Sequence, residues 1–205
     1  MKKDKILLVG AGGHAISCME IIESDDLYEI VGVIGYKSER NKKVLNYNII
    51  GCDDNLSNLL SKSKNAFITI GQIKSSSLRK KMFTKLIKIG YKLPTIISST
   101  SLVSRHSYVS KGSIVMKNTV INAGVKIGKN CIINNGAIIE HGVEIGDHCH
   151  ISTGVIINGD VKIGNGTFIG SQSTIKEGVK IGTNSIIGMG SRVLKNIDNN
   201  ITHMN

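Results

Sequence analysis

Histidines and their neighbours in the second half of this 205-residue chain are the residues best suited to chemistry. His141 follows Glu140, and His148 and His150 flank Cys149. An imidazole, whose ordinary pKa lies near ~6.5, can accept a proton at neutral pH and act as a general base. Imidazoles are also common metal ligands, but neighbouring residues of a strand point to opposite sides, so Cys149 cannot join His148 and His150 around one ion. We therefore expect no metal site, and an exposed corner residue is the alternative interpretation of His141.

A strict six-residue repeat must position these side chains. The residues from 97 to 193 in steps of six are Ile or Val at all 17 positions, and the residue four places later is small at every one but the last, Ile197. A period of six matches neither a 3.6-residue helix nor a coiled coil. It is typical of a solenoid in which three hexads, each a short strand and a corner, close an 18-residue coil. We expect the Ile or Val of each hexad and the small residue four places later to point inward. We expect Gly and Asn to form the corners, because these residues tolerate the left-handed dihedrals that tight corners need.

The predicted coil stacks residues 18 apart in the sequence at the ~4.8 Å spacing of adjacent strands. One such column comprises Lys126, Glu144, Lys162 and Lys180. We interpret it as a charge ladder that neutralises itself, because Glu144 interrupts the lysines; a basic stripe for phosphates is the alternative. Cys131 and Cys149 fall on the inward small position, so packing is their expected role.

The formal net charge of +11, from 26 Lys and Arg against 15 Asp and Glu, favours anionic partners. Nucleic acid is not expected, because only 4% of the residues are aromatic and the lysines are spread along the chain. A membrane is not expected either, since no apolar run approaches the ~18 residues of a span and the start MKKDKILLVGAGG lacks a signal-peptide pattern. We predict a cytoplasmic protein with reduced cysteines.

The first half of the chain alternates strand-like and helix-like segments. Residues 5–10, 29–35 and 65–71 are apolar like buried strands, and residues 75–90 show helical spacing from a capping Ser75 to a terminating Gly90. The apolar stripe of that helix comprises Leu78, Met82, Phe83, Leu86 and Ile87. This alternation predicts a parallel sheet flanked by helices.

A glycine-rich turn follows the first strand and contains Gly10, Gly12, Gly13 and His14. Glycines let a backbone approach a phosphate, and the start of the next helix supplies N–H donors. Dinucleotide-binding domains also carry an acid after the second strand, where this chain has Gly35 and Tyr36, so NAD is not expected. The turn predicts binding of a nucleotide phosphate; a tight strand–helix turn without a ligand is the alternative.

The GAGGH turn, the ITIG segment near residue 70 and the hexads with IIEHGVEIGDHCHIS together resemble the sialic acid O-acetyltransferase family. That family includes nucleotide-aminosugar N-acetyltransferases of the bacillosamine and viosamine types. The resemblance covers nearly the whole chain. It implies an α/β Rossmann-like domain over residues 1–96 that binds the sugar nucleotide, and a left-handed parallel β-helix of hexapeptide repeats over residues 97–205. It also implies a homotrimer whose active sites lie between neighbouring β-helices, with acetyl-CoA along the β-helix.

The resemblance assigns roles to individual residues. His141 matches the general base, and Asn134 matches a residue near the acceptor amine. The family often has an acid directly after the base, where this chain has Gly142, so Glu140 or a backbone carbonyl is expected to orient the imidazole. The implied acetyl-CoA contacts are His150, Gly159, Ser171 and Met189. The implied contacts to the sugar nucleotide are Gly10, Gly12, Gly13, His14, Tyr36 and Gly71.

The implied reaction is direct acetyl transfer from acetyl-CoA to the amine of a UDP- or dTDP-linked 4-amino-4,6-dideoxy sugar, for lipopolysaccharide, capsule or another surface glycan. Backbone N–H groups at the corners could stabilise the oxyanion of such a transfer. The alternatives are O-acetylation of a sialic-acid-type sugar and a non-catalytic or metal-binding trimeric β-helix.

Overall fold

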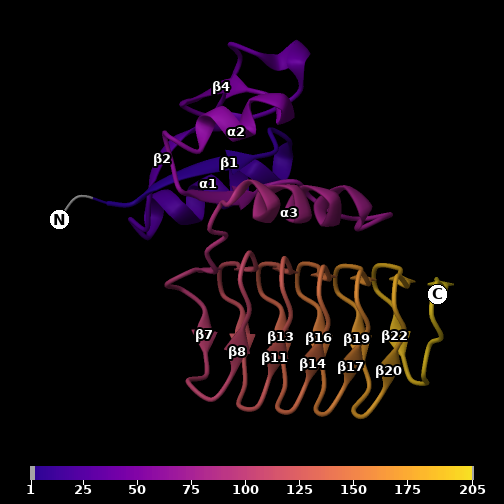
Figure 1. Cartoon of the computed structure of the whole chain (residues 1–205). Helices are drawn as coiled ribbons and strands as arrows, with labels where there is room; N and C mark the ends of the chain where they lie inside the picture. Colours follow the sequence, from indigo (N-terminus) through magenta and orange to yellow (C-terminus); the bar gives the residue numbers. More distant parts are fainter. Residues whose placement is uncertain (1–2, 205) are drawn as a thin grey trace. The chain divides into compact units, whose positions relative to one another are not determined.

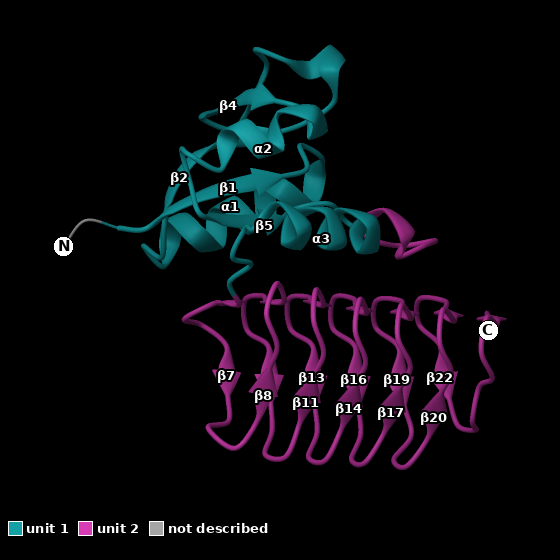
Figure 2. Ribbon diagram, in the orientation of Figure 1, with its two compact units in different colours: residues 1–71, 79–94 teal, residues 72–78, 95–205 magenta. Residues whose placement is uncertain are grey.

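The computed structural model describes residues 3–204, which form two compact units. The first contains the chain up to Gly71 together with Arg79–Pro94, and the second contains Gln72–Leu78 and the chain from Thr95 onward (Figure 2). The short segment Gln72–Leu78 thus packs with the repeats, although in the sequence it follows a strand of the first half and includes the first two residues of the next helix.

The first unit is a sheet with helices, as the alternation predicted. Its elements are β1 (Lys5–Val9), α1 (Gly13–Ser24), β2 (Glu29–Ile34), β3 (Lys43–Val44), β4 (Tyr47–Gly51), α2 (Leu56–Leu59), β5 (Asn65–Ile68) and α3 (Ser77–Ile89), with 3-10 turns at Lys37–Glu39 and Asp53–Asn55. The strand order is β3-β4-β2-β1-β5, in which only β3 runs antiparallel to its neighbour. The hairpin of β3 and β4 was not anticipated from the sequence.

Helix α3 differs from its predicted apolar stripe. Met82, Phe83 and Leu86 are buried, but Leu78 and Ile87 are exposed, so the stripe is narrower than predicted. The additional buried residue is Arg79, which is 1% exposed and whose Nη1 donates to the carbonyls of Ile68 at 3.1 Å and Ile70 at 2.5 Å. A charged side chain can take this position because backbone carbonyls accept hydrogen bonds from its guanidinium Nη1.

The second unit is the predicted parallel β-helix, with two-residue strands in three sheets (Figure 1). Sheet I contains β6 (Ile96–Ile97), β9 (Ile114–Val115), β12 (Ile132–Ile133), β15 (His150–Ile151), β18 (Phe168–Ile169), β21 (Ile186–Ile187) and β23 (Thr202–His203). Sheet II contains β7 (Leu102–Val103), β10 (Val120–Ile121), β13 (Ile138–Ile139), β16 (Ile156–Ile157), β19 (Thr174–Ile175) and β22 (Arg192–Val193). Sheet III contains β8 (Tyr108–Val109), β11 (Lys126–Ile127), β14 (Glu144–Ile145), β17 (Lys162–Ile163) and β20 (Lys180–Ile181).

The register confirms the coil length predicted from the repeat. Ile121 pairs with Ile139, and Ile139 with Ile157, so neighbouring strands are 18 residues apart. The last coil departs from this spacing, because Ile186 pairs with Thr202. Left-handed residues occur every six positions from Gly112 to Gly190, which confirms the predicted corners.

The core of the β-helix consists of the two predicted inward sets. The aliphatic positions from 115 to 193 are all buried, while Ile97, Val103 and Val109 at the first end of the stack are partly open. The small positions from 113 to 191 are also buried. Most of the hydroxyl residues among them donate to carbonyls of the neighbouring coil, as Thr167 Oγ1 does to Gly182 O at 2.7 Å, whereas the Ser191 Oγ has no hydrogen-bond partner. Most of the inward hydroxyls are thereby satisfied within the protein.

Candidate active site

The predicted base lies at the corner between sheets II and III, which recurs every 18 residues. His141 is exposed there, and Gly159 occupies the same place in the next coil. A Cβ added to Gly159 would lie 2.6 Å from Cε1 and 2.7 Å from Nε2 of the His141 ring, so the imidazole lies directly on the Gly159 backbone. The Glu140 carboxylate accepts a hydrogen bond from Asn122 Nδ2 at 2.8 Å. The contact of the imidazole with Gly159 therefore positions it, while Asn122 holds the adjacent carboxylate.

A second cluster lies along the edge where sheet I turns into sheet II. His150 is outward-facing on β15 yet only 7% exposed, and its Nε2 lies 3.4 Å from Asn134 Nδ2 in the preceding coil. Farther along the same edge, Ser171 Oγ lies 2.8 Å from Ser152 Oγ. Met189 follows in the next coil and is 83% exposed. These residues, polar except for Met189, line an edge on which an extended ligand could lie.

The structure therefore divides the predicted acetyl-transfer residues between two edges. Asn134, His150, Ser171 and Met189 lie on the edge between sheets I and II. Glu140, His141 and Gly159 lie on the edge between sheets II and III. The outer face of sheet II separates the two groups within one chain.

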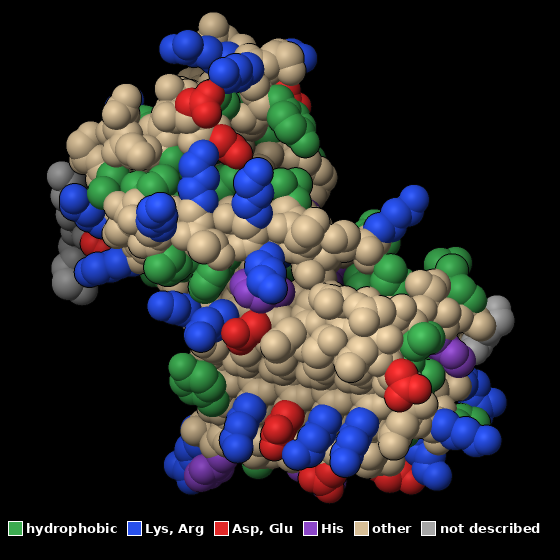
Figure 3. Space-filling view, turned by 45° about the vertical axis from the view of Figure 1, so that its right-hand side comes forward, with side chains coloured by type: hydrophobic (Ala, Val, Ile, Leu, Met, Phe, Trp, Pro, Cys, Tyr) green, Lys and Arg blue, Asp and Glu red, His purple; other side chains and the backbone are tan. Residues whose placement is uncertain are grey.

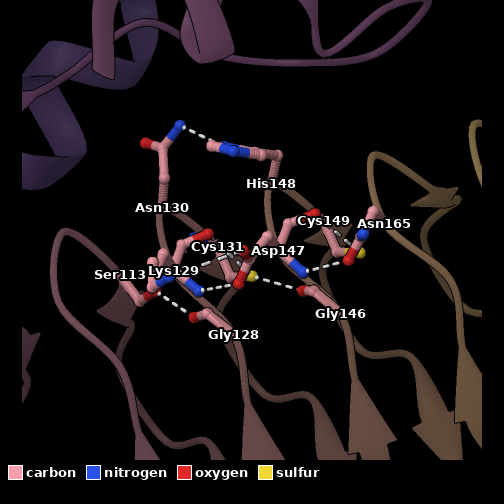
Figure 4. A network of polar contacts seen from close by, with 10 residues as sticks. All are labelled: Ser113, Gly128, Lys129, Asn130, Cys131, Gly146, Asp147, His148, Cys149 and Asn165. Carbon is pink, nitrogen blue, oxygen red and sulfur yellow. Dashed lines mark hydrogen bonds and ion pairs between the residues drawn. The ribbon is translucent and has the colours of Figure 1, made fainter. Parts of the chain in front are cut away.

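The third edge, between sheets III and I, carries a polar network of structural character (Figure 4). Asn130 Nδ2 and His148 Nδ1 are 2.9 Å apart, and the carboxylate of Asp147 accepts the backbone N–H of Lys129 at 2.7 Å. Beneath them Cys149 donates to the carbonyl of Gly164 at 3.1 Å inside the core. Burial raises the pKa of the Cys149 thiol well above its usual value.

The cysteine of the HCH segment thus faces the core, whereas His148 lies at the edge between sheets III and I and His150 points outward from β15, beside the edge between sheets I and II. Within residues 3–204, no group of three or more His, Cys, Asp or Glu side chains is arranged to hold a metal ion.

A groove of about 870 Å³ runs along the outer face of sheet III, and its lining includes Lys126, Glu144, Lys162 and Lys180. These residues stack in consecutive coils, as predicted (Figure 3). Lys162 Nζ lies 3.6 Å from Glu144 Oε1, which fits the interpretation as a ladder of neutralising charges. None of the predicted site residues lines this groove.

In the first unit, the glycine-rich turn lies at the carboxyl end of β1. Gly10 has φ +121°, and a Cβ there would lie 2.6 Å from the Ile70 side chain, so the position requires glycine. Gly12 is the residue before helix α1 and Gly13 its first residue, with open space around both. His14 Nε2 lies 3.4 Å from Cys18 Sγ. The first-turn N–H groups of α1 thus face space in which an anion could bind.

The remaining two predicted nucleotide contacts lie at the same edge of the sheet. A Cβ added to Gly71 would lie 3.6 Å from His14 Cβ, which places the end of the β5 segment beside the turn. Tyr36 follows β2 and is exposed. In parallel sheets, ligands bind at the carboxyl ends of strands, so these residues share the expected location.

Sequence reasoning missed an acid at this edge. The 3-10 turn after β2 brings Glu39 back, so that its Oε2 accepts the Tyr36 N–H at 2.8 Å and lies 2.8 Å from where a Gly35 Cβ would be. The spacing Tyr36-x-x-Glu39, typical of a residue that folds back onto a turn start, was the available signal. The end of β2 therefore does carry a carboxylate.

Two family descriptions match most of the chain between them. The PglD N-terminal domain matches residues 5–86, and the bacterial transferase hexapeptide (six repeats) matches residues 106–141, 125–159 and 160–195. No helix in the described part of the chain is long and apolar enough to cross a membrane.

Solved structures match nearly the whole length of the chain. A histidine variant of perosamine N-acetyltransferase from Caulobacter crescentus, in complex with CoA and GDP-perosamine, is 26% identical over 98% of this chain and 93% of that one, with a TM-score of 0.92. PerB from the same organism, also with CoA and GDP-perosamine, is 27% identical over 95% and 91%, with a TM-score of 0.89. The acetyltransferase domain of PglB from Neisseria gonorrhoeae, with acetyl coenzyme A, shares the fold at 23% identity over 99% and 97%, with a TM-score of 0.90.

Proposed function

We propose that this protein is an acetyl-CoA-dependent N-acetyltransferase that acts on the amine of a nucleotide-linked amino sugar. The observation that carries the proposal is the match of both units, over 98% of the chain, to an N-acetyltransferase holding CoA and GDP-perosamine. The same likeness favours N-acetylation over the O-acetylation suggested by the wider sialic acid O-acetyltransferase family. It also adds GDP to UDP and dTDP as nucleotides to test. A reaction in the cytoplasm, serving surface glycans, belongs to the same proposal.

The division of site residues between two edges supports an active site formed by two copies of the chain. Sheet II lies between these edges. The first four residues of its outward column are apolar, namely Leu102, Val120, Ile138 and Ile156, and Thr174 and Arg192 complete the column. Leu102 is 71% exposed and Ile156 37%. The equivalent column of sheet III is charged. An exposed apolar column next to both clusters is suited to packing against a second copy of the chain. In a homotrimer each copy makes this contact with the next, so that His141 of one copy faces Asn134 and His150 of its neighbour.

His141 is the proposed general base. As the amine nitrogen attacks the thioester carbonyl, the imidazole takes its proton, and the C–N bond forms while the carbonyl oxygen gains negative charge. Collapse of this intermediate breaks the C–S bond, and the imidazolium returns a proton to the departing thiolate. Holding both substrates in one cleft supplies a further entropic contribution of at most ~7–11 kcal/mol. No cysteine nucleophile is needed, in keeping with the buried positions of Cys131 and Cys149.

The carboxyl edge of the first sheet is the proposed site for the sugar nucleotide. Gly12, Gly13 and the first turn of α1 offer backbone N–H groups to the diphosphate. Glu39, beside Tyr36, offers a carboxylate to ribose hydroxyls, which are hydrogen-bond donors. The residue thus takes the place of the acid that the sequence lacks directly after β2.

Release of CoA thiol tests the proposal. The purified protein should release thiol from acetyl-CoA with at least one 4-amino sugar linked to UDP, dTDP or GDP. His141→Ala should slow that release by about 10²–10⁴-fold, the range typical of losing a general base, and leave a measurable residual rate. Mass spectrometry of the product should show an added acetyl group that resists mild base, as an amide does and an ester does not. Absence of thiol release with every amino sugar nucleotide would refute the proposal, and loss of activity on chelation would favour the metal-binding alternative.

A further inference from the structure

Gln72 is a buried residue that no sequence pattern singled out, and it packs against the β-helix within the second unit. Its side chain is 3% exposed, and Nε2 donates to the carbonyl of His148 at 3.0 Å and reaches that of Gly166 at 3.5 Å. Its backbone carbonyl lies 2.5 Å from His150 Nδ1. The amide side chain thus anchors the backbone that contacts the His150 ring.

The chemistry of these groups determines which nitrogen of His150 carries the proton. A backbone carbonyl can only accept a hydrogen bond, so His150 Nδ1 must donate to Gln72 O. In a neutral imidazole the other nitrogen then has a lone pair. That nitrogen, Nε2, faces Asn134 Nδ2 at 3.4 Å, and an amide nitrogen only donates.

The orientation of the Asn134 amide agrees independently with this assignment. Its Oδ1 accepts the backbone N–H of Asn135 at 2.8 Å, which fixes the oxygen on that side and turns Nδ2 toward His150. Phe168 meets the His150 ring edge-on, with centroids 5.2 Å apart and an interplanar angle of 70°. Each contact from Asn135 through Asn134 and His150 to Gln72 therefore pairs one donor with one acceptor.

We infer that Gln72 is a positioning residue that holds His150 in the neutral Nδ1–H tautomer, so that the Asn134 amide, rather than the imidazole, is the hydrogen-bond donor to the acyl oxygen in this cluster. Neutral His150 has no proton on Nε2 to give to a thioester oxygen. Asn134 Nδ2 carries two protons, one for His150 and one for an oxygen in the site. This deepens the proposed function, on which its catalytic part rests, and changes the role that the family resemblance implied for His150.

Nuclear magnetic resonance tests the tautomer without any substrate. The protein is labelled with ¹⁵N-histidine, and the His150 resonances are assigned by their loss in a His150→Gln variant. At a pH where the ring is neutral, His150 should show a protonated Nδ1 and an unprotonated Nε2. Gln72→Met keeps the side-chain volume but removes both N–H donors, and it should mix the two tautomers. Ile73→Ala is the matched control, because Ile73 is in the same segment but 66% exposed, and it should leave the spectrum unchanged. A protonated Nε2 in the native protein would overturn the inference, even if Gln72→Met does not fold.

A double-mutant cycle tests the catalytic part. Asn134→Ala should lower kcat about 100-fold, the loss typical of removing one oxyanion donor, and Gln72→Met should lower it about tenfold through the loosened ring. The double variant should lose no more than Asn134→Ala alone, because Gln72 acts through Asn134. Independent losses that multiply would show a merely structural role for Gln72 and overturn this part. If the wild type transfers no acetyl group to any sugar nucleotide, the proposed function fails, while the resonance experiment still decides the tautomer.

Discussion

Substituting Gly159 by alanine should displace the proposed base without unfolding the protein. The added methyl would lie 2.6 Å from Cε1, 2.7 Å from Nε2 and 3.2 Å from Nδ1 of the His141 imidazole. Carbon atoms in ordinary contact are ~3.5–4 Å apart, so the ring must move by about 1 Å. Because His141 is exposed, its ring can swing outward at little cost in stability. The backbone of Gly159 also lies outside the left-handed region, so alanine fits there without strain.

A displacement of this size at a reacting group costs about 100-fold in rate. We therefore expect kcat for thiol release to fall about 100-fold in Gly159→Ala. The melting temperature should stay equal or rise slightly, because a compatible Gly-to-Ala change stabilises by about 0.4–1 kcal/mol through the unfolded state. Steady-state kinetics with acetyl-CoA varied, together with calorimetry, measure both effects.

The His141→Ala background supplies the control for Gly159→Ala. With the imidazole gone, the added methyl has nothing to displace, so it should cause no further loss of kcat. If the methyl instead obstructs acetyl-CoA, the KM for acetyl-CoA should rise equally in both backgrounds. Wild-type kcat in Gly159→Ala would refute the assignment of His141 as the base at this contact.

Three further predictions concern the core, the thiols and the assembly. Ile157→Ala should lower the free energy of unfolding by about 2–5 kcal/mol in urea titrations, because Ile157 is fully buried in the β-helix core. Burial raises the pKa of the Cys18 thiol from about 9 to about 12, so this thiol ionises at lower pH in the unfolded chain than in the folded one. The free energy of unfolding should therefore fall as pH rises from 9 toward 12. Cys18→Ala should show a smaller fall, and an equal fall would contradict the assignment of this pH dependence to Cys18. Ile156→Glu on sheet II should dissociate the proposed homotrimer, as measured by light scattering, and abolish activity. Lys162→Glu on sheet III should change neither the oligomeric state nor the activity. An intact trimer in Ile156→Glu would contradict the proposed interface.

The repetitive part of the fold was predictable because its pattern is local. Each hexad repeats the same alternation of inward and outward side chains, and one coil length places all the inward residues in the core. The pairing of Ile139 with Ile157 and the column that contains Glu144 and Lys162 follow from that length alone. The stacking of His141 on Gly159 obeys the same 18-residue rule, although the sequence analysis assigned Gly159 to the acetyl donor.

The non-repetitive half was less predictable. The hairpin of β3 and β4 is short and lacks a long apolar run, so the sequence analysis missed it. Arg79 is polar in the sequence and yet buried, because carbonyls at the end of β5 accept its hydrogen bonds. Glu39 was missed because a 3-10 turn, rather than a strand, returns its carboxylate to Tyr36. For Arg79 and Glu39, a specific polar contact, and not hydrophobic periodicity, determines the position of the side chain.

The sequence alone thus determined the winding of the β-helix, its inward residues and the candidate histidines. Only the tertiary structure showed that Asn134 and His141 lie at different edges and that Gln72 contacts His150 across 78 residues of sequence. The physical reason is that a solenoid converts a local repeat into contacts at one constant separation. The docking of a non-repeating segment such as Gln72–Leu78 depends instead on which donors and acceptors the folded surface leaves to be satisfied.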